Sequence, residues 1–212
     1  MKSKTTVIEG IAASLPLANL DTDQIMPKQF LRGIDKKGLA AGLLYDLRFH
    51  PDGTPRPDFI LNLPRYRAVS ILVGAANFGC GSSREHAVWG MQQFGIKAVL
   101  APSFGEIFYS NAMNNGLLLV KLPDDALSQL LEQGGQEAVH LAIDLQKMEV
   151  SNGKLSVPFQ LSERHHKMML DGLDMLGVSL QYENEIMQFA EKWHAQRPWL
   201  KNVGRVVREK LG

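Results

Sequence analysis

The sequence predicts an α/β domain with a mixed β-sheet and flanking helices, on the strength of two observations. In the middle of the chain, three short apolar runs alternate with two helix-like segments, which is the pattern of consecutive βαβ units. Further along, the pair Asn152-Gly153 separates two more apolar runs, which is typical of a β-hairpin. Because βαβ units give parallel strands and a hairpin gives antiparallel ones, the two together predict a mixed sheet.

The first third of the chain contains two segments that the sequence describes less sharply. Lys36–Tyr45 predicts a short helix, although Gly38 and Gly42 weaken it. His50–Pro57 holds three prolines and one glycine, so we expect a loop there. In the same part of the chain we expect strands at Thr6–Ala13 and Ala68–Val73 and a polar loop at Asn19–Gln24.

Two helices of the middle part end at a glycine. Ser83–Phe94 is followed by Gly95, and Gly105–Asn115 is followed by Gly116. Glycine is the residue that most often follows a helix, because it adopts the left-handed conformation without a steric penalty. The remaining predicted strands are Lys97–Ala101, Leu117–Val120, His140–Val150 and Leu155–Phe159, and the remaining helices are Asp124–Gln133, Leu161–Leu170 and Glu183–Gln196.

Length and charge restrict the function classes. The chain has 212 residues, which suits one domain with a helical extension, and 45% of them are hydrophobic. Its formal net charge of +1 argues against an extended basic surface for nucleic acid or membrane. The N-terminus has no apolar signal region, and no run reaches the roughly 18 apolar residues of a membrane span. We therefore expect a cytoplasmic protein that binds neither nucleic acid nor membrane.

The single cysteine, Cys80, excludes an intrachain disulfide and an all-cysteine iron–sulfur or zinc site within this chain. None of the six histidines lies in a ligand motif, and His165 and His166 would point about 100° apart on a helix. The sequence therefore predicts no metal site. Cys80 is either a reactive thiolate near Arg84 or a small residue that fills a tight turn, and we favour the second interpretation.

The segment NFGCGSSREH, Asn77–His86, carries the clearest chemical signal. It joins an apolar strand to a helix through a glycine-rich turn, so unpaired backbone N–H groups at the helix N-terminus would face an anion. Arg84 adds a planar fork that matches a carboxylate or a phosphate. The alternative is a capped helix with Ser82 or Ser83 as the N-cap. The two interpretations are compatible, because capping would present the hydroxyls where an anion binds.

A second group of polar residues is Asp21-Thr22-Asp23, which precedes Arg32 by a short loop. Asp-Thr-Asp favours an Asx-turn that caps a following helix. On the residues alone, Asp23 is equally well explained by such a turn and by a role in a binding site.

The segment NFGCGSSREH resembles the signature of the mobile "swivel" domain of the aconitase family. Three other segments resemble the isopropylmalate dehydratase small subunits of that family, and the resemblance runs from about Thr5 to Leu180. It implies the swivelling β/β/α fold, with a domain over residues 1–180 and a helical extension over residues 181–212. The three segments are NLDTDQIMPKQFL at Asn19–Leu31, APSFGEIFYSNAMNNGLLLVKL at Ala101–Leu122 and DGLDMLGVSL at Asp171–Leu180.

The resemblance implies a hydro-lyase of leucine biosynthesis. Such enzymes isomerise 2-isopropylmalate to 3-isopropylmalate by dehydration and rehydration. The family places a [4Fe–4S] cluster on a separate large subunit, so this chain is expected to bind a dicarboxylate substrate and that partner, but no cofactor of its own. Two alternatives stay open: a related hydratase acting on citraconate, maleate or dimethylmalate, and a free-standing carboxylate- or phosphate-binding module.

The resemblance also implies the roles of five residues. Ser82 would be the catalytic base, held as an alkoxide by its electropositive turn. Ser83 and Arg84 would hold a substrate carboxylate, and so would Arg32. Asp23 would join the hydrogen-bond network of the active site. We assign the nearby His86 to structure, because it lies one helical turn further on.

Overall fold

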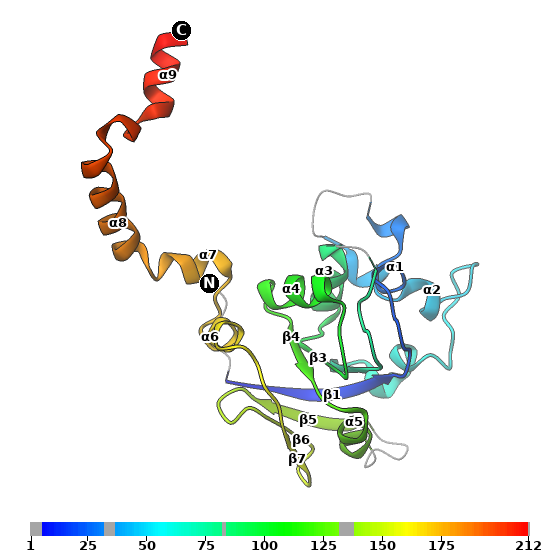
Figure 1. Ribbon diagram of the computed structural model, residues 1–212. Helices are drawn as coiled ribbons and strands as arrows, with labels where there is room; N and C mark the ends of the chain where they lie inside the picture. Colours follow the sequence, from blue (N-terminus) through cyan, green and yellow to red (C-terminus); the bar gives the residue numbers. More distant parts are fainter. Residues whose placement is uncertain (1–5, 32–36, 82–83, 132–137, 212) are drawn as a thin grey trace. The chain divides into compact units, whose positions relative to one another are not determined.

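In the computed structural model, the parts of the chain that are described are residues 6–31, 37–81, 84–131 and 138–211. Within these residues, seven strands form one mixed sheet with the order β4-β3-β2-β1-β5-β6-β7 (Figure 1). The predicted fold class is therefore confirmed. The strands are β1 (Val7–Leu15), β2 (Val69–Gly74), β3 (Ala98–Ala101), β4 (Leu118–Lys121), β5 (Val139–Asp144), β6 (Glu149–Ser151) and β7 (Ser156–Pro158).

Strand β1 joins a parallel half of the sheet to an antiparallel half. Its later residues pair with parallel β2, its earlier residues pair with antiparallel β5, and the register shifts between Ile11 and Ala12. A Cβ on Gly10 would lie 2.1 Å from Ser70 Oγ, so only glycine lets β1 approach β2 this closely. The parallel half, β1 to β4, has all its carboxyl ends at one edge of the sheet.

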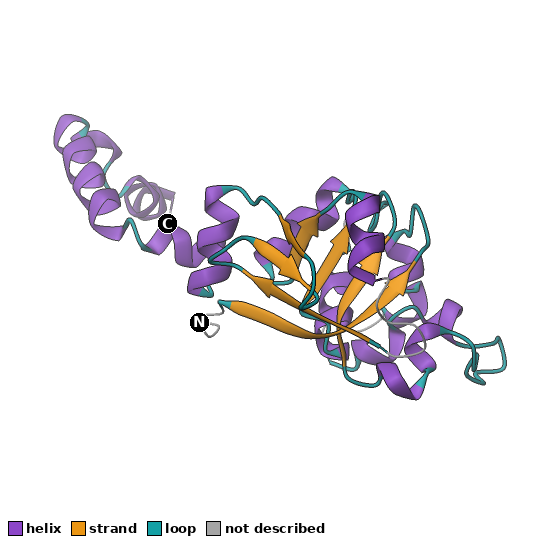
Figure 2. Cartoon of the chain, turned by 90° about the horizontal axis from the view of Figure 1, so that it is seen from below, coloured by secondary structure: helices purple, strands orange, loops and turns teal. Residues whose placement is uncertain are grey.

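Helices connect successive parallel strands of the sheet. Helix α3 follows β2 and helix α4 follows β3, and the two lie side by side (Figure 1). Figure 2 shows the strands of the sheet in orange with helices in purple packed around them. All six residues of β2 are buried. The helices of this part are α1 (Thr22–Ile25), α2 (Tyr45–Arg48), α3 (Glu85–Phe94), α4 (Glu106–Asn114), α5 (Asp124–Leu131) and α6 (Glu163–Asp171).

Three predicted elements are wrong. The loop predicted at Asn19–Gln24 contains the start of α1, because the capping box of Asp21 and Gln24 begins a helix at Thr22. The described part of the helix predicted at Lys36–Tyr45, residues 37–45, does not form one helix, because Gly38 and Leu44 both adopt the left-handed conformation and divide it into a 3-10 turn and the start of α2. The predicted strand His140–Val150 is two strands, β5 and β6. Asp144 Oδ1 accepts hydrogen bonds from the backbone N–H groups of Gln146 (2.8 Å) and Lys147 (2.9 Å), and this turn breaks the strand.

The chain divides into two compact units, Met1–Asp174 and Met175–Gly212. The second unit contains α7 (Met175–Leu180), α8 (Glu183–Gln196) and α9 (Val203–Leu211). The resemblance placed the boundary at residue 180 because the family-like motif ends there, whereas packing places α7 in the second unit. In the described part of the chain, no helix has the length and apolar character that a membrane span requires.

Candidate functional site

The loops that follow β1 and β2 are joined backbone to backbone at the carboxyl edge of the sheet. The N–H of Asn19 donates to the carbonyl of Ala76 at 2.9 Å, and the N–H of Gly79 donates to the carbonyl of Leu20 at 2.7 Å. The N–H of Thr22 then donates to the carbonyl of Cys80 at 2.9 Å. The glycine-rich turn is therefore an extension of the parallel pairing of β1 and β2.

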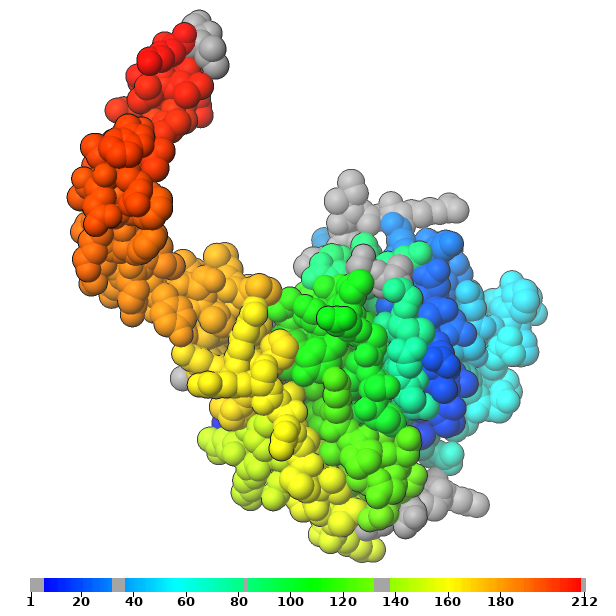
Figure 3. All heavy atoms as spheres, viewed as in Figure 1, coloured from blue at the N-terminus to red at the C-terminus, as the bar shows by residue number. Residues whose placement is uncertain are grey.

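The loop after β3 joins the same turn from its other side. Phe78 donates from its N–H to the carbonyl of Ser103 at 3.0 Å, and its carbonyl accepts from the N–H of Gly105 at 2.9 Å. Its buried ring packs near the rings of Phe104 and Phe108. In Figure 3 the segments that follow β1, β2 and β3, coloured dark blue, blue-green and green, adjoin on the surface. Parallel α/β sheets place their ligand sites at this edge.

Two glycines are required by the close packing of this turn. Gly79 has φ +73°, and a Cβ there would lie 2.3 Å from Cγ of Phe108. A Cβ on Gly105 would lie 2.5 Å from the carbonyl oxygen of Gly79. Any side chain at either position would push the two loops apart, so Gly79 and Gly105 are needed for this packing.

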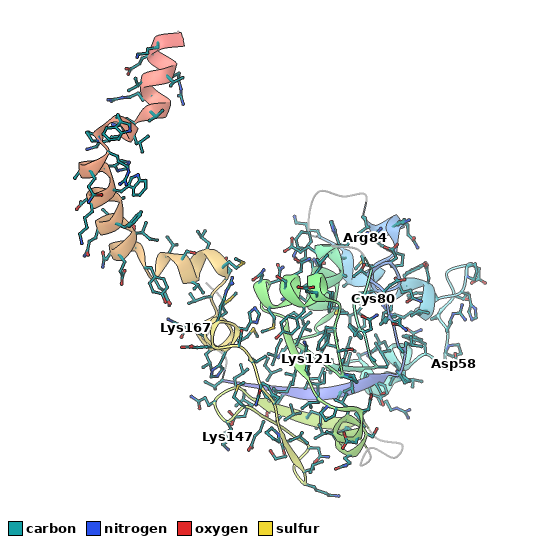
Figure 4. The ribbon with its side chains drawn as sticks, viewed as in Figure 1. Asp58, Cys80, Arg84, Lys121, Lys147 and Lys167 are labelled. Carbon is teal, nitrogen blue, oxygen red and sulfur yellow. The ribbon has the colours of Figure 1, made fainter. Side chains whose placement is uncertain are left out.

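Cys80 is half-buried, and its thiol donates a hydrogen bond to the carbonyl of Asn19 at 3.3 Å. Figure 4 shows Cys80 and Arg84 at the same end of the sheet. The thiol thus ties the turn to the loop after β1, which favours the interpretation of Cys80 as a small structural residue.

Asp21 caps helix α1, as the sequence pattern predicts. Its Oδ1 accepts from the N–H of Gln24 at 2.7 Å, and Gln24 Oε1 accepts from the N–H of Asp21 at 3.1 Å, which completes a capping box. This reciprocal pair fixes the first turn of α1 and thereby the position of Asp23, which is left for another role.

That role is an ion pair between Asp23 and Arg84, which the sequence places 61 residues apart. Their side chains are 46% and 23% exposed, so the pair is partly exposed to solvent, although the two contacting atoms are buried. Arg84 also occupies the N-cap position of α3 with an extended backbone, and the helix begins at Glu85. The alternative interpretation, in which the hydroxyl of Ser82 or Ser83 caps this helix, concerns residues that lie outside the described ones.

The other predicted site residues are Ser82, Ser83 and Arg32, and they lie outside the described residues. Their roles remain predictions. His86 is half-buried beside the ring of Trp89, with a centroid distance of 4.9 Å, in agreement with a structural role.

Two residues make tertiary contacts that the local sequence does not indicate. Asn115 ends α4, as predicted, but its side chain also bonds to Glu85 and Trp89 of α3. Arg48 donates to Asn62 Oδ1 and to the carbonyl of Leu43, both at 3.2 Å. Burial lowers the pKa of the Arg48 guanidinium. Nothing in the local sequence signals these tertiary partners.

The residues of this chain do not fit a metal cluster. The sequence has one cysteine, and among the described residues no group of three or more His, Cys, Asp or Glu side chains could hold a metal ion. An iron–sulfur cluster needs several thiolates around it. Any such group in a complete active site must therefore be held by another chain.

Comparison with known proteins places this site in a family. The model of the aconitase C-terminal domain matches residues 2–125, which include both Asp23 and Arg84. The "3-isopropylmalate dehydratase small subunit 1" of Chromobacterium violaceum is 58% identical over 207 residues, covering 97% of this chain and 98% of that protein. The chain belongs to the family of isopropylmalate dehydratase small subunits.

Two further similar proteins, one relative and one solved structure, agree with this assignment. The protein of that name from Paramagnetospirillum magneticum is 44% identical over 200 residues, covering 93% of this chain and 99% of the relative. A crystal structure of 3-isopropylmalate dehydratase (leuD) from Methanocaldococcus jannaschii superposes with a TM-score of 0.63 at 27% identity, covering 87% of this chain and 99% of that one. The fold implied by the resemblance, the aconitase swivel domain, is confirmed.

Proposed function

We propose that this chain is the small subunit of a cytoplasmic 3-isopropylmalate dehydratase, a hydro-lyase of leucine biosynthesis. The enzyme removes water from 2-isopropylmalate and adds it back to the neighbouring carbon, which gives 3-isopropylmalate. Nearly full-length similarity to proteins named for this activity supports the proposal. The chain would contribute one wall of an active site that a large subunit completes.

The observation that carries the proposal is the pairing of Arg84 with Asp23 where three loops meet. A guanidinium has five N–H donors in a rigid plane, and a carboxylate partner fixes the direction of that plane. The contact between Arg84 Nη1 and Asp23 Oδ1 uses one edge of the group. The donors on its other edges could then bind one carboxylate of a dicarboxylate substrate in a bidentate manner.

The reaction requires a base and a Lewis acid. A C–H beside a carboxylate must lose its proton, and we propose that Ser82 takes it, two residues before Arg84 in the sequence. Ser83 and Arg32 would add donors to the substrate carboxylates. A [4Fe–4S] cluster on the large subunit would supply the Lewis acid that assists departure of the hydroxyl group. This chain, with one cysteine, would orient the substrate and move the proton.

A reconstitution assay tests the proposal. The purified chain is mixed anaerobically with a cluster-loaded isopropylmalate dehydratase large subunit, and the unsaturated acid is followed by its ultraviolet absorbance. We expect turnover of isopropylmalate only when both chains are present, and its loss in Ser82→Ala. Turnover of citraconate in place of isopropylmalate would assign the chain to a sister hydratase. Tight binding of a dicarboxylate by the isolated chain, without turnover in any mixture, would support a free-standing binding module.

A further inference from the structure

Asn115, at the end of α4, makes several hydrogen bonds with residues of α3. Its side-chain amide donates to Glu85 Oε1 at 2.6 Å, and its side-chain oxygen accepts from Trp89 Nε1 at 2.9 Å. Its backbone carbonyl accepts from Gln92 Nε2 at 2.8 Å. The C-cap residue of α4 thus bonds to three residues of α3.

The three partners lie on one face of α3. Glu85, Trp89 and Gln92 are spaced by four and three residues, which places them above one another along the helix. At a rise of about 1.5 Å per residue, they span roughly 10 Å of the helix axis. Because Asn115 bonds to both ends and the middle of this stripe, α3 cannot slide or rotate past α4 without breaking these hydrogen bonds.

Asn115 is itself held firmly. Its side-chain amide donates a second hydrogen bond to the carbonyl of Asn111 at 2.8 Å, and its backbone N–H donates to the carbonyls of Asn111 and Ala112. Gly116 follows with φ +70°, which ends the helix. Aspartate at this position could not donate to Glu85, because an ionised carboxylate only accepts hydrogen bonds.

The stripe begins directly beside Arg84. Glu85 is the first residue of α3 and Arg84 is its N-cap, so a shift of the first turn moves the guanidinium away from Asp23. Asp23 is anchored independently by the capping box of Asp21 and Gln24. The ion pair therefore depends on two separate anchors, one on each side, and Asn115 provides the one on the side of Arg84.

We propose that Asn115, acting through Glu85, is a positioning residue for Arg84 and thereby for the carboxylate of the substrate. It touches no reacting atom. It fixes the axial position of α3 so that the arginine meets both Asp23 and the substrate. This inference rests on the proposed function, since the substrate carboxylate is part of that proposal.

The test compares four variants of the full-length chain in the complex with a large subunit. Asn115→Ala and Glu85→Ala remove the hydrogen bond at the first turn, and Glu85→Gln keeps an oxygen that accepts it. Asn62→Ala is the matched control. Asn62 also makes three side-chain hydrogen bonds, to Arg48 Nε (3.2 Å) and to the carbonyls of Arg48 (2.7 Å) and Arg56 (2.9 Å), within the segment between β1 and β2.

We expect kcat/KM to fall about 10- to 100-fold in Asn115→Ala and Glu85→Ala, because small displacements of a positioning group have effects of this size. Glu85→Gln should restore most of the activity, and Asn62→Ala should lose thermal stability without a comparable loss of kcat/KM. In an Arg84→Lys background, Glu85→Ala should have little further effect, because the two changes act on one interaction.

Hydrogen exchange of the isolated chain gives a readout that needs no activity. Asn115→Ala should raise exchange of the hydrogen-bonded amides of α3, whereas Asn62→Ala should not. Equal exchange there in both variants, or fully additive losses of kcat/KM with Arg84→Lys, would overturn the inference. If Asn115→Ala does not fold, Glu85→Ala carries the same tests. Absence of turnover by the wild-type complex would refute the proposed function instead, and exchange would still decide whether Asn115 fixes α3.

Discussion

Asn77 donates a hydrogen bond from its side-chain amide to the side-chain oxygen of Asn19, at 2.8 Å, and both residues adopt the left-handed conformation, with φ of +59° and +57°. The two lie 58 residues apart in the sequence and open the loops after β2 and β1. The backbone N–H of Asn77 also donates to Ser103 Oγ at 2.8 Å. Asn77 therefore joins all three loops that form the site.

Replacing Asn77 with alanine should lower the free energy of unfolding by about 1–3 kcal/mol. The change removes one hydrogen bond, and it leaves a residue with a Cβ in the left-handed region, where asparagine is better tolerated. Asn77→Gly removes the same hydrogen bond but accepts the backbone conformation, so its loss should be smaller. Urea denaturation of the three proteins measures the difference, and equal losses would contradict the role of the backbone.

Of the substitutions that add one methyl group to the glycine-rich turn after β2, Gly79→Ala should lower the free energy of unfolding most. Gly79 has φ +73° and would place the new Cβ 2.3 Å from the ring of Phe108, so we expect a loss of about 3 kcal/mol or more. Gly153→Ala is the matched control. It has φ +87° and no heavy atom within 4 Å of the new Cβ, so it should lose only about 1–2 kcal/mol. Similar losses at the two sites in thermal or urea unfolding would rule out steric contact as the cause.

Asp23→Asn and Arg84→Lys should separate activity from stability. The ion pair is partly exposed to solvent, so its loss should change the free energy of unfolding by less than about 1 kcal/mol. The reconstituted kcat/KM should nevertheless fall by a factor on the order of 100, because lysine cannot bind a carboxylate in a bidentate manner. Lys147→Ala, which removes the exposed pair with Asp144, is the control and should leave kcat/KM unchanged. A large loss of stability in Arg84→Lys would point to a structural role instead.

His165 should make folding sensitive to mild acid. Burial, and secondly the charge of Arg164, lower the pKa of His165 in the folded protein, so the unfolded chain binds its proton more readily. The contribution of neutral His165 to the free energy of unfolding is fully present above the pKa of the unfolded chain, about 6.5. It is lost as the pH falls below that value and through the lower pKa of the folded protein. Relative to the wild type, His165→Gln should therefore lose less stability between neutral and mildly acidic pH. Parallel curves for the two proteins would show that another group is responsible.

A chain that ends at Asp174 should keep the fold of the first unit. Among the described residues, the buried hydrophobic side chains run from Ile8 to Leu173, so the truncation removes none of them. Thermal unfolding of the truncated chain should stay within a few degrees of the full chain, since little core is lost. A chain that ends at residue 160 is the contrasting variant, because it lacks the buried Met168 and Met169 of α6 and should be markedly destabilised.

The fold was largely predictable because the local signals are strong. The strands before and after α3 are short apolar runs, and the helix ends at Gly95 because a left-handed residue is needed there. Prediction of the elements failed where a turn interrupts a segment whose residue pattern favours one continuous strand or helix. Residues 140–150 are apolar enough for one strand, but Asp144 closes a turn through its side chain and divides them. The helix expected at residues 36–45 is interrupted at Leu44, a residue whose own preference gives no warning of a left-handed conformation.

The sequence by itself determined the family, the fold class and the glycine-rich turn with Arg84, because these depend on residue types at fixed spacing along the chain. Only the tertiary structure decided which residues meet at the carboxyl edge of the sheet. The pairing of Asp23 with Arg84 and the contacts of Asn115 with α3 join residues that are distant in sequence. Side chains of this kind carry no periodic signal, and they become neighbours only when the strands pair and the helices pack.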